Sequence, residues 1–415
     1  MLEDDAPARS RRELVLTAVG ALAGGKVLST LAVWTTNVAG AILVFDLTRS
    51  ALIVGLVSVA QFTPQLALTP WAGARADRGD RFVQVIVGTA ITTLGSVLLT
   101  AWAIGFGFTT ERDAWLMVAA AGLVGTGFSV SGPATSALLP ALVRRSELAD
   151  ALALSSLPIV VARSAGPAIG AAIYLAAGPT VTFGLSGLLH LSFISLLIVL
   201  RRRIVVAARD GGDAPDGGVR AGLAHLRRSP RTVLQIVGVG VIGIGTDPIT
   251  TLTPALTVAL GMPEAFVGTL ASTFGLGAGV GYVVLPRVRL AVGIMRLGGI
   301  GLAALGAGTF VAGVAPVAWL AIAGVALGGV GLSFSLNAFT TLVQADAPDA
   351  LRGRVMALWS MAFLGSRPIT ALSTGWLTDA VGVRFALVLS AAAILAGARA
   401  TRGARMLARP VHTGG

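Results

Sequence analysis

The chain of 415 residues contains no cysteine and only 3 histidines. Without thiols it can form neither a disulfide bond nor a thiolate metal site, and it has no cysteine nucleophile. The histidines, His190, His225 and His412, lie far apart in the sequence, and no HExxH, P-loop or GxSxG pattern occurs. We therefore expect no enzyme, no catalytic residue, no cofactor and no metal site.

Charged residues are also scarce. They make up 12% of the chain, whereas hydrophobic residues make up 55%, which leaves too little polar surface for a water-soluble globule of this length. The net charge of +12 would suit a nucleic-acid partner only if the basic residues formed one soluble face, and here they lie between apolar runs. The composition predicts an integral membrane protein that does not bind nucleic acid.

Long apolar runs fill most of the sequence. A helix needs about 20 mostly apolar residues to cross the hydrocarbon core of a bilayer. The runs are continuous rather than alternating, which favours helices over a transmembrane barrel. We predict an all-α protein with twelve transmembrane helices, at 15–46, 51–73, 82–107, 114–143, 147–177, 180–200, 231–260, 264–286, 294–314, 316–344, 352–378 and 383–400.

The distribution of basic residues predicts the orientation of these helices. Most of the 31 lysine and arginine residues fall in loops that share one side of the membrane with the N-terminus, and cytoplasmic loops carry this excess. We expect both termini in the cytoplasm and the protein in a bacterial cytoplasmic membrane. The polar start, MLEDDAPARSRRE, is typical of a cytoplasmic tail rather than a signal peptide.

The predicted helices form two sets of six. The shift that places Arg163 on Arg367 also places Gly178 on Gly382, which indicates diverged repeats. Parallel six-helix repeats surround a cleft with a ligand site near the membrane midplane. The predicted segments are a cytoplasmic tail at 1–14, a helix bundle at 15–200, a cytoplasmic linker at 201–230, a second bundle at 231–400 and a cytoplasmic tail at 401–415.

The bend between the second and third predicted helices, WAGARADRGDRF, concentrates charge. It resembles the loop signature of the major facilitator superfamily, and its DR-x-DR spacing resembles the branch of macrolide efflux proteins and enterobactin exporters; the matching and neighbouring residues are Gly73, Asp77, Arg78, Asp80 and Arg81. Gly73 would allow a tight turn, and Asp77 would pair with arginines across the interface of the halves, as a conformational gate. The alternative is a solvated loop that only follows the positive-inside rule.

A second resemblance lies within 147–177. Gly166, Pro167 and Gly170 match the antiporter signature G-P-x-x-G-G, with Ala171 in place of its last glycine. The glycines would let another helix approach, and Pro167 would bend the helix at a hinge. Helix packing alone is the alternative explanation. The arginine that the superfamily carries in its fourth helix is missing, since Gly122 stands near its place.

Four charged residues lie deep within predicted spans: Lys26, Arg163, Asp247 and Arg367. A charge at mid-bilayer costs at least about 2.5 kcal/mol, so each should have a partner, a wet cavity or a function. Asp247 is our candidate for proton coupling, with a permanent ion pair and a contact to a cationic substrate as alternatives. If Arg163 and Arg367 both face the cleft, they would favour an anionic cargo; otherwise they satisfy local helix carbonyls.

Neutral polar and aromatic residues could complete a substrate cavity, although lipid anchoring or core packing is the commoner role of any single aromatic. These candidates are Trp34, Asn37, Gln61, Gln65, Asn337 and Trp359.

The resemblance covers nearly the whole chain and implies a monomeric transporter that works by alternating access. We expect proton-coupled efflux of a small amphipathic molecule, drug-like or siderophore-like, with protons and membrane lipid as the other partners. A lysophospholipid transporter or an uncoupled facilitator is one alternative. A membrane sensor or assembly partner that does not transport is another.

Overall fold

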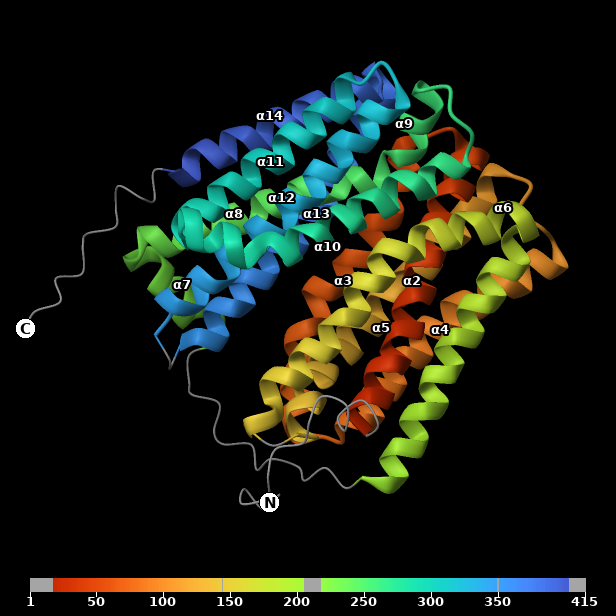
Figure 1. Ribbon diagram of the computed structural model, residues 1–415. Coiled ribbons are helices and arrows are strands. Elements are labelled where there is room, and N and C mark those ends of the chain that lie inside the picture. The colour runs from red at the N-terminus through yellow and green to blue at the C-terminus, as the bar shows by residue number, and fades with distance from the viewer. Residues whose placement is uncertain (1–17, 144, 205–217, 349–350, 403–415) are drawn as a thin grey trace, which may run out of the picture. The chain divides into compact units, whose positions relative to one another are not determined.

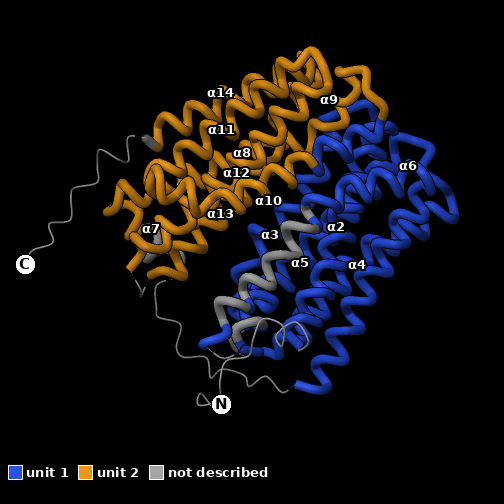
Figure 2. The backbone as a smooth tube through the Cα atoms, viewed as in Figure 1, with its two compact units in different colours: residues 1–214, 264–272 blue, residues 215–263, 273–415 orange. Residues whose placement is uncertain are grey.

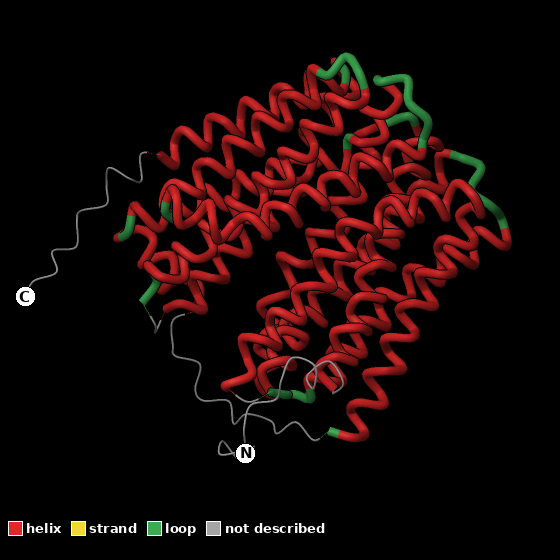
Figure 3. The backbone as a smooth tube through the Cα atoms, in the orientation of Figure 1, coloured by secondary structure: helices red, strands yellow, loops and turns green. Residues whose placement is uncertain are grey.

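The computed structural model describes residues 18–143, 145–204, 218–348 and 351–402. These residues form helices joined by short connections, and no strand occurs among them (Figures 1 and 3). The predicted N-terminal tail, most of the predicted C-terminal tail and the middle of the predicted linker lie outside the described residues. The all-α fold predicted from the continuous apolar runs is confirmed.

The described part of the first half of the chain contains five long helices. Short connections separate them, including the 3-10 turns η1 (Glu111–Asp113) and η2 (Arg145–Glu147). The helices are α2 (Ala18–Thr48), α3 (Ala51–Arg78), α4 (Arg81–Gly105), α5 (Ala114–Ala141) and α6 (Leu148–Arg203).

Helix α6 consists of two helices joined at a sharp bend. It is 56 residues long, and Gly178 inside it has a φ of 76°, a left-handed conformation that glycine adopts without steric cost. The chain reverses direction within α6 (Figure 1), at the boundary predicted between the spans 147–177 and 180–200. Among the described residues, eleven helices are long and apolar enough to cross a membrane. Because α6 contains two of the predicted crossings, these eleven helices correspond to the twelve predicted spans.

The second half begins with a short surface helix. This helix, α7 (Gly218–Arg228), lies in the predicted linker. The predicted span 231–260 breaks at Leu252, four residues after Pro248, into α8 (Pro230–Thr251) and α9 (Thr253–Ala259). The remaining helices are α10 (Ala265–Val292), α11 (Ile294–Val314), α12 (Ala318–Asp346), α13 (Arg352–Val381) and α14 (Val383–Arg402).

The chain divides into two compact units (Figure 2). Unit 1 contains residues 1–214 and 264–272, and unit 2 contains residues 215–263 and 273–415. The first turns of α10 thus pack with unit 1. The predicted domain boundaries stay a prediction, because the N-terminal tail, residues 205–217 of the linker and residues 403–415 lie outside the described residues.

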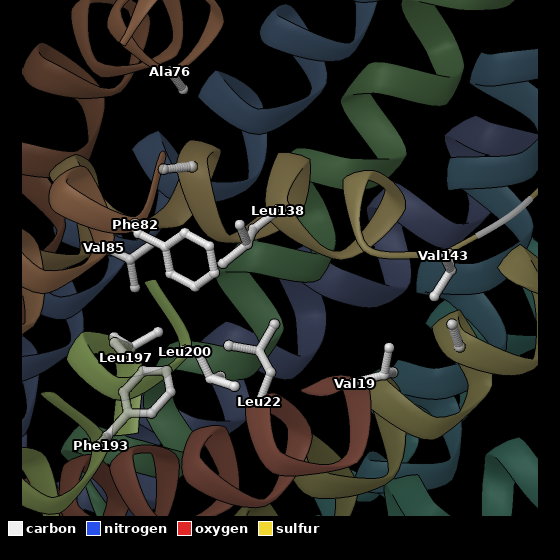
Figure 4. Packing of buried hydrophobic residues seen from close by; sticks show 12 residues of the cluster. Val19, Leu22, Ala76, Phe82, Val85, Leu138, Val143, Phe193, Leu197 and Leu200 are labelled. Atoms are coloured by element: carbon white, nitrogen blue, oxygen red, sulfur yellow. The ribbon is translucent and has the colours of Figure 1, made fainter. Parts of the chain in front are cut away.

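One end of unit 1 contains a cluster of buried apolar side chains from five helices, α2 to α6 (Figure 4). Leu22 of α2, Phe82 of α4, Leu138 of α5 and Leu197 of α6 all belong to it. Water cannot drive such association between helices inside a bilayer, so van der Waals contact must supply most of the stabilisation. The cluster therefore depends on complementary shape more than on hydrophobicity.

In unit 2, helices α11 and α12 approach so closely that their backbones touch. A Cβ atom on Gly331 of α12 would lie 2.5 Å from the carbonyl oxygen of Gly301 in α11, and one on Gly301 would lie 2.7 Å from the carbonyl oxygen of Gly331. Such atoms cannot move aside as a flexible side chain would. These two positions therefore require glycine for packing.

We predict that Gly331→Ala lowers the free energy of unfolding by about 1–3 kcal/mol, because a methyl group is forced against backbone. Thermal unfolding of the purified protein in detergent would measure the loss. Gly353→Ala is the matched control, since a Cβ there would meet nothing within 4 Å. Equal melting temperatures for the two variants would contradict the close approach of α11 and α12.

Candidate functional site

The charged bend lies between α3 and α4, and its turn is formed by Gly79 and Asp80. Gly79 donates its N–H to the carbonyl oxygen of Arg75 at 2.8 Å. Gly73 lies inside α3, and a Cβ atom there would meet nothing within 4 Å. The expectation that Gly73 makes the turn is therefore wrong, because α3 continues to Arg78.

Asp80 caps the first turn of α4 and also pairs with the end of α6. Its Oδ1 accepts a hydrogen bond from the backbone N–H of Val83 at 3.1 Å, and its Oδ2 lies 2.9 Å from Nε of Arg201. Burial acts to raise the pKa of Asp80, but the Val83 amide and the Arg201 guanidinium outweigh it and hold this pKa below its ordinary value. The bend thus joins α4 to α6 within unit 1.

The other charged residues of the bend contribute less to the described structure. Arg81 donates from Nε to the carbonyl oxygen of Ala76 at 3.3 Å. The side chains of Asp77 and Arg78 lie outside the described residues, so the gate expected around Asp77 stays a prediction. The role of Arg201 was missed by the sequence analysis because 121 positions separate it from Asp80.

Gly166 and Gly170 place α6 directly against α2. A Cβ atom on Gly166 would lie 2.7 Å from Cβ of Trp34, and one on Gly170 would lie 2.7 Å from Cα of Thr35. Directly after the buried Pro167, the N–H of Ala168 donates to Oγ of Ser272 at 2.8 Å instead of remaining unsatisfied. This segment is a close helix contact, as the packing interpretation expects.

Two of the four deep charges meet in unit 2. Oδ1 of Asp247 lies 3.8 Å from Nε of Arg367, and the Asp247 side chain is 0% exposed while that of Arg367 is 16% exposed. Thr251 donates to Oδ2 of Asp247 at 3.4 Å. Both residues are predicted from the sequence as deep charges, but their pairing with each other is not.

Lys26 of unit 1 lines a cavity of about 80 Å³ formed by α2, α4, α5 and α6. His190, which is 1% exposed, also lines this cavity, and its Nδ1 lies 3.0 Å from Oγ of Ser29. His190 was not among the residues expected to line a site. Helical spacing places Lys26, Ser29, Thr30 and Val33 on one face of α2, and this pattern is the signal that could have indicated the cavity.

The remaining candidates are distributed over several helices. Gln65 donates from Nε2 to the carbonyl oxygen of Gln61 at 3.1 Å, so the two share a face of α3 as expected. Asn37 is half-buried in α2, and the side chain of Arg163 lies outside the described residues. Oδ1 of Asn337 and Nε1 of Trp359 are buried without a hydrogen-bond partner among the described residues, which leaves both able to meet water or cargo.

A further ion pair, which the sequence analysis missed, joins α8 to α12 in unit 2. Oδ2 of Asp346 lies 2.9 Å from Nε of Arg231 and accepts a hydrogen bond from Nε2 of Gln235 at 2.6 Å. It ties the start of one helix to the end of another, as Asp80 and Arg201 do in unit 1. Within the described residues, no group of three or more potential metal ligands occurs.

The match to a known family decides the class of protein. A family model described as a transmembrane secretion effector, MFS_3, matches residues 18–409. The chain belongs to this family of the major facilitator superfamily. It is therefore a membrane transporter and not an enzyme, as the absence of catalytic patterns predicted.

Two relatives are siderophore transporters. The staphyloferrin A transporter of Staphylococcus aureus is 26% identical over 253 residues, which are 60% of this chain and 62% of that protein. The chain thus matches less than two thirds of that relative's length. The enterobactin exporter of Citrobacter koseri is 26% identical over 321 residues, which are 76% of this chain and 71% of that protein.

Solved structures of similar fold are also transporters. A bacterial homologue of the iron transporter ferroportin has a TM-score of 0.73 at 16% identity and covers 94% of this chain and 99% of its own. A bacterial homologue of the human lysosomal transporter Spinster has a TM-score of 0.74 at 13% identity and covers 96% of this chain and 98% of its own. At these identities the likeness establishes the fold alone.

The two roles of Asp80 can be separated by substitution. We predict that Asp80→Ala lowers the free energy of unfolding by about 1 kcal/mol, because the α4 cap is lost. Asp80→Asn keeps an acceptor oxygen and should lose no more than about 0.5 kcal/mol, since the pair with Arg201 is solvent-exposed. Thermal unfolding in detergent would measure both, and equal losses would contradict the capping role.

The same variants should respond to pH. Because the folded pKa of Asp80 is lowered, its charge contributes stability above the ordinary aspartate pKa of about 3.9, and this contribution is lost as the pH falls through the folded value. The difference between the wild type and Asp80→Asn should therefore shrink below about pH 3.9. A difference that stays constant over this range would contradict the shift.

Proposed function

We propose that this chain exports a small anionic amphipathic molecule, of the siderophore or drug-like class, by alternating access in exchange for protons. The observation that carries export is the family match over residues 18–409, together with relatives named as siderophore transporters. The concentration of arginines in alternate loops supports cytoplasmic termini in a bacterial inner membrane.

Asp247 is the proposed proton-coupling residue. It is a fully buried carboxylate in a helix that breaks just beyond it, at Leu252. A buried carboxylate is costly unless it is paired or protonated, and Arg367 supplies a partner 3.8 Å away. Because this separation is longer than a tight charge-assisted contact of about 2.7–2.9 Å, a proton can compete with Arg367 for Asp247.

If the contact between Asp247 and Arg367 is instead a permanent ion pair, transport should not be coupled to protons. Asp247 and Arg367 would then stay paired throughout transport, and the protein would be an uncoupled facilitator. The two cases differ in whether cargo movement carries protons. The proton stoichiometry of transport therefore separates them, whereas the stability of the pair does not.

For the test, the protein would be reconstituted in vesicles that contain a pH-sensitive dye, and citrate-type and catecholate siderophores would be added. We predict that Asp247→Asn reduces cargo-driven proton flux at least tenfold, while downhill cargo exchange continues. Asp379→Asn is the matched control, because Asp379 is an exposed carboxylate of the same unit. Equal proton flux in the wild type and Asp247→Asn would remove Asp247 from coupling.

A second variant guards against misfolding. Asp247→Asn removes the charged partner of Arg367, whose side chain is 16% exposed, and breaking a buried pair typically costs about 3–5 kcal/mol. The double variant Asp247→Asn, Arg367→Gln removes both charges and should restore the amount of folded protein. It should still lack cargo-driven proton flux, and proton flux in this variant would contradict the proposal.

A further inference from the structure

The Lys26 cavity has a lining whose hydrogen-bonding capacity can be worked out atom by atom. Several of its residues are threonine or serine, and most of these hydroxyls donate to the carbonyl four residues earlier in the same helix. Thr89 bonds to Val85 and Ser131 to Gly127, each at 2.8 Å, and Thr30 bonds to Lys26 at 2.7 Å. Since these protons are committed to backbone, the hydroxyls offer the cavity acceptors only.

Donors into the cavity come from two residues. Lys26 makes no side-chain hydrogen bond or ion pair with any residue that the structure describes, so its ammonium keeps all three N–H groups. His190 is held at Nδ1 by Ser29, which leaves Nε2 as the nitrogen that can serve a ligand. These two groups belong to different helices, α2 and α6.

The charge of the cavity is uncompensated. The residues that line it include Lys26 but neither aspartate nor glutamate, and an ammonium removed from water is costly without a counter-charge. A cationic ligand would add to this cost. An anionic group would remove it, and one negative charge suffices.

The size of the cavity limits the ligand to one functional group. A water molecule requires about 10–15 Å³ of cavity volume. A cavity of about 80 Å³ therefore holds several waters or one carboxylate and cannot enclose a whole siderophore. Phe128, which lines the cavity and is 39% exposed, offers an apolar contact to whatever extends from that carboxylate.

We propose that this cavity binds one carboxylate of the transported molecule, with Lys26 as the counter-charge and His190 as the second donor. The proposal rests on the export function and narrows its cargo to carboxylates. A phosphate group fits less well, because its second negative charge would have no partner among the lining residues.

Binding can be tested without transport, on the full chain in detergent, with benzoate as the probe. We expect benzoate to raise the melting temperature of the wild type in a concentration-dependent manner. Benzamide, which has the same shape but no charge, should not. Phenyl phosphate should stabilise less than benzoate, and a larger effect of phenyl phosphate would overturn the carboxylate assignment.

Variants of Lys26 provide the decisive comparison. Lys26→Met should remain folded, since it deletes a half-buried charge that has no ion-pair partner among the described residues, and should weaken benzoate binding at least tenfold. Lys26→Arg keeps the charge and should retain part of the affinity. His190→Phe should weaken binding severalfold, whereas Thr69→Val, a change in α3 outside the lining, should leave it unchanged. Equal benzoate binding by the wild type and Lys26→Met would overturn the proposal.

The outcome is independent of the Asp247 experiment. If Lys26 binds benzoate but no cargo moves in vesicles, the site stands and the export proposal fails. If cargo moves with protons and Lys26→Met binds benzoate as the wild type does, export stands and the carboxylate site fails.

Discussion

An ionised group inside a bilayer must be compensated by the protein, because hydrocarbon offers neither water nor counter-ions. In unit 2 this constraint is met by pairing Asp247 with Arg367 between α8 and α13. In unit 1 it is met differently, by placing Lys26 beside a cavity that several hydroxyl side chains also line. The two arrangements differ in net charge. The Asp247–Arg367 pair is electrically neutral, whereas the cavity beside Lys26 retains a positive charge.

The two units also differ in how their helix ends are tied together. Asp80 caps α4 and reaches Arg201 at the end of α6. The turn between α10 and α11 in unit 2, which corresponds to it in the repeat, instead contains Gly293 with a φ of 78° and no side-chain cap. In unit 2 the ion pair that joins two helix ends lies elsewhere, between Arg231 of α8 and Asp346 of α12. The superfamily signature in the bend between α3 and α4 is therefore found in unit 1 and not in the corresponding turn of unit 2, although both units consist of long apolar helices.

Local sequence patterns predicted the features that depend on neighbouring residues. The apolar runs predicted the helices, and the Gly178 boundary marked where α6 reverses, because a positive φ favours glycine. Gly73 was assigned to the wrong place for a similar reason: glycine also occurs inside membrane helices, and nothing nearby indicated that α3 continues to Arg78.

Contacts between distant segments could not be predicted in this way. Ser29 and His190 are separated by 161 positions, and Gln235 and Asp346 by 111. Which residues meet across helices depends on the rotation of each helix about its axis, and in a bilayer that rotation is set by packing rather than by an apolar face. Individual polar residues were therefore found from the sequence, while their partners were not.

The glycine seam between α11 and α12 has a mechanical consequence. Where side chains separate two helices, rotamer changes let them slide, but backbone atoms in direct contact have no such freedom. The contact at Gly301 and Gly331 therefore makes α11 and α12 move as one rigid pair. If unit 2 changes conformation, its helices must bend at other places. One such place is Leu252, where the chain between α8 and α9 already departs from a straight helix.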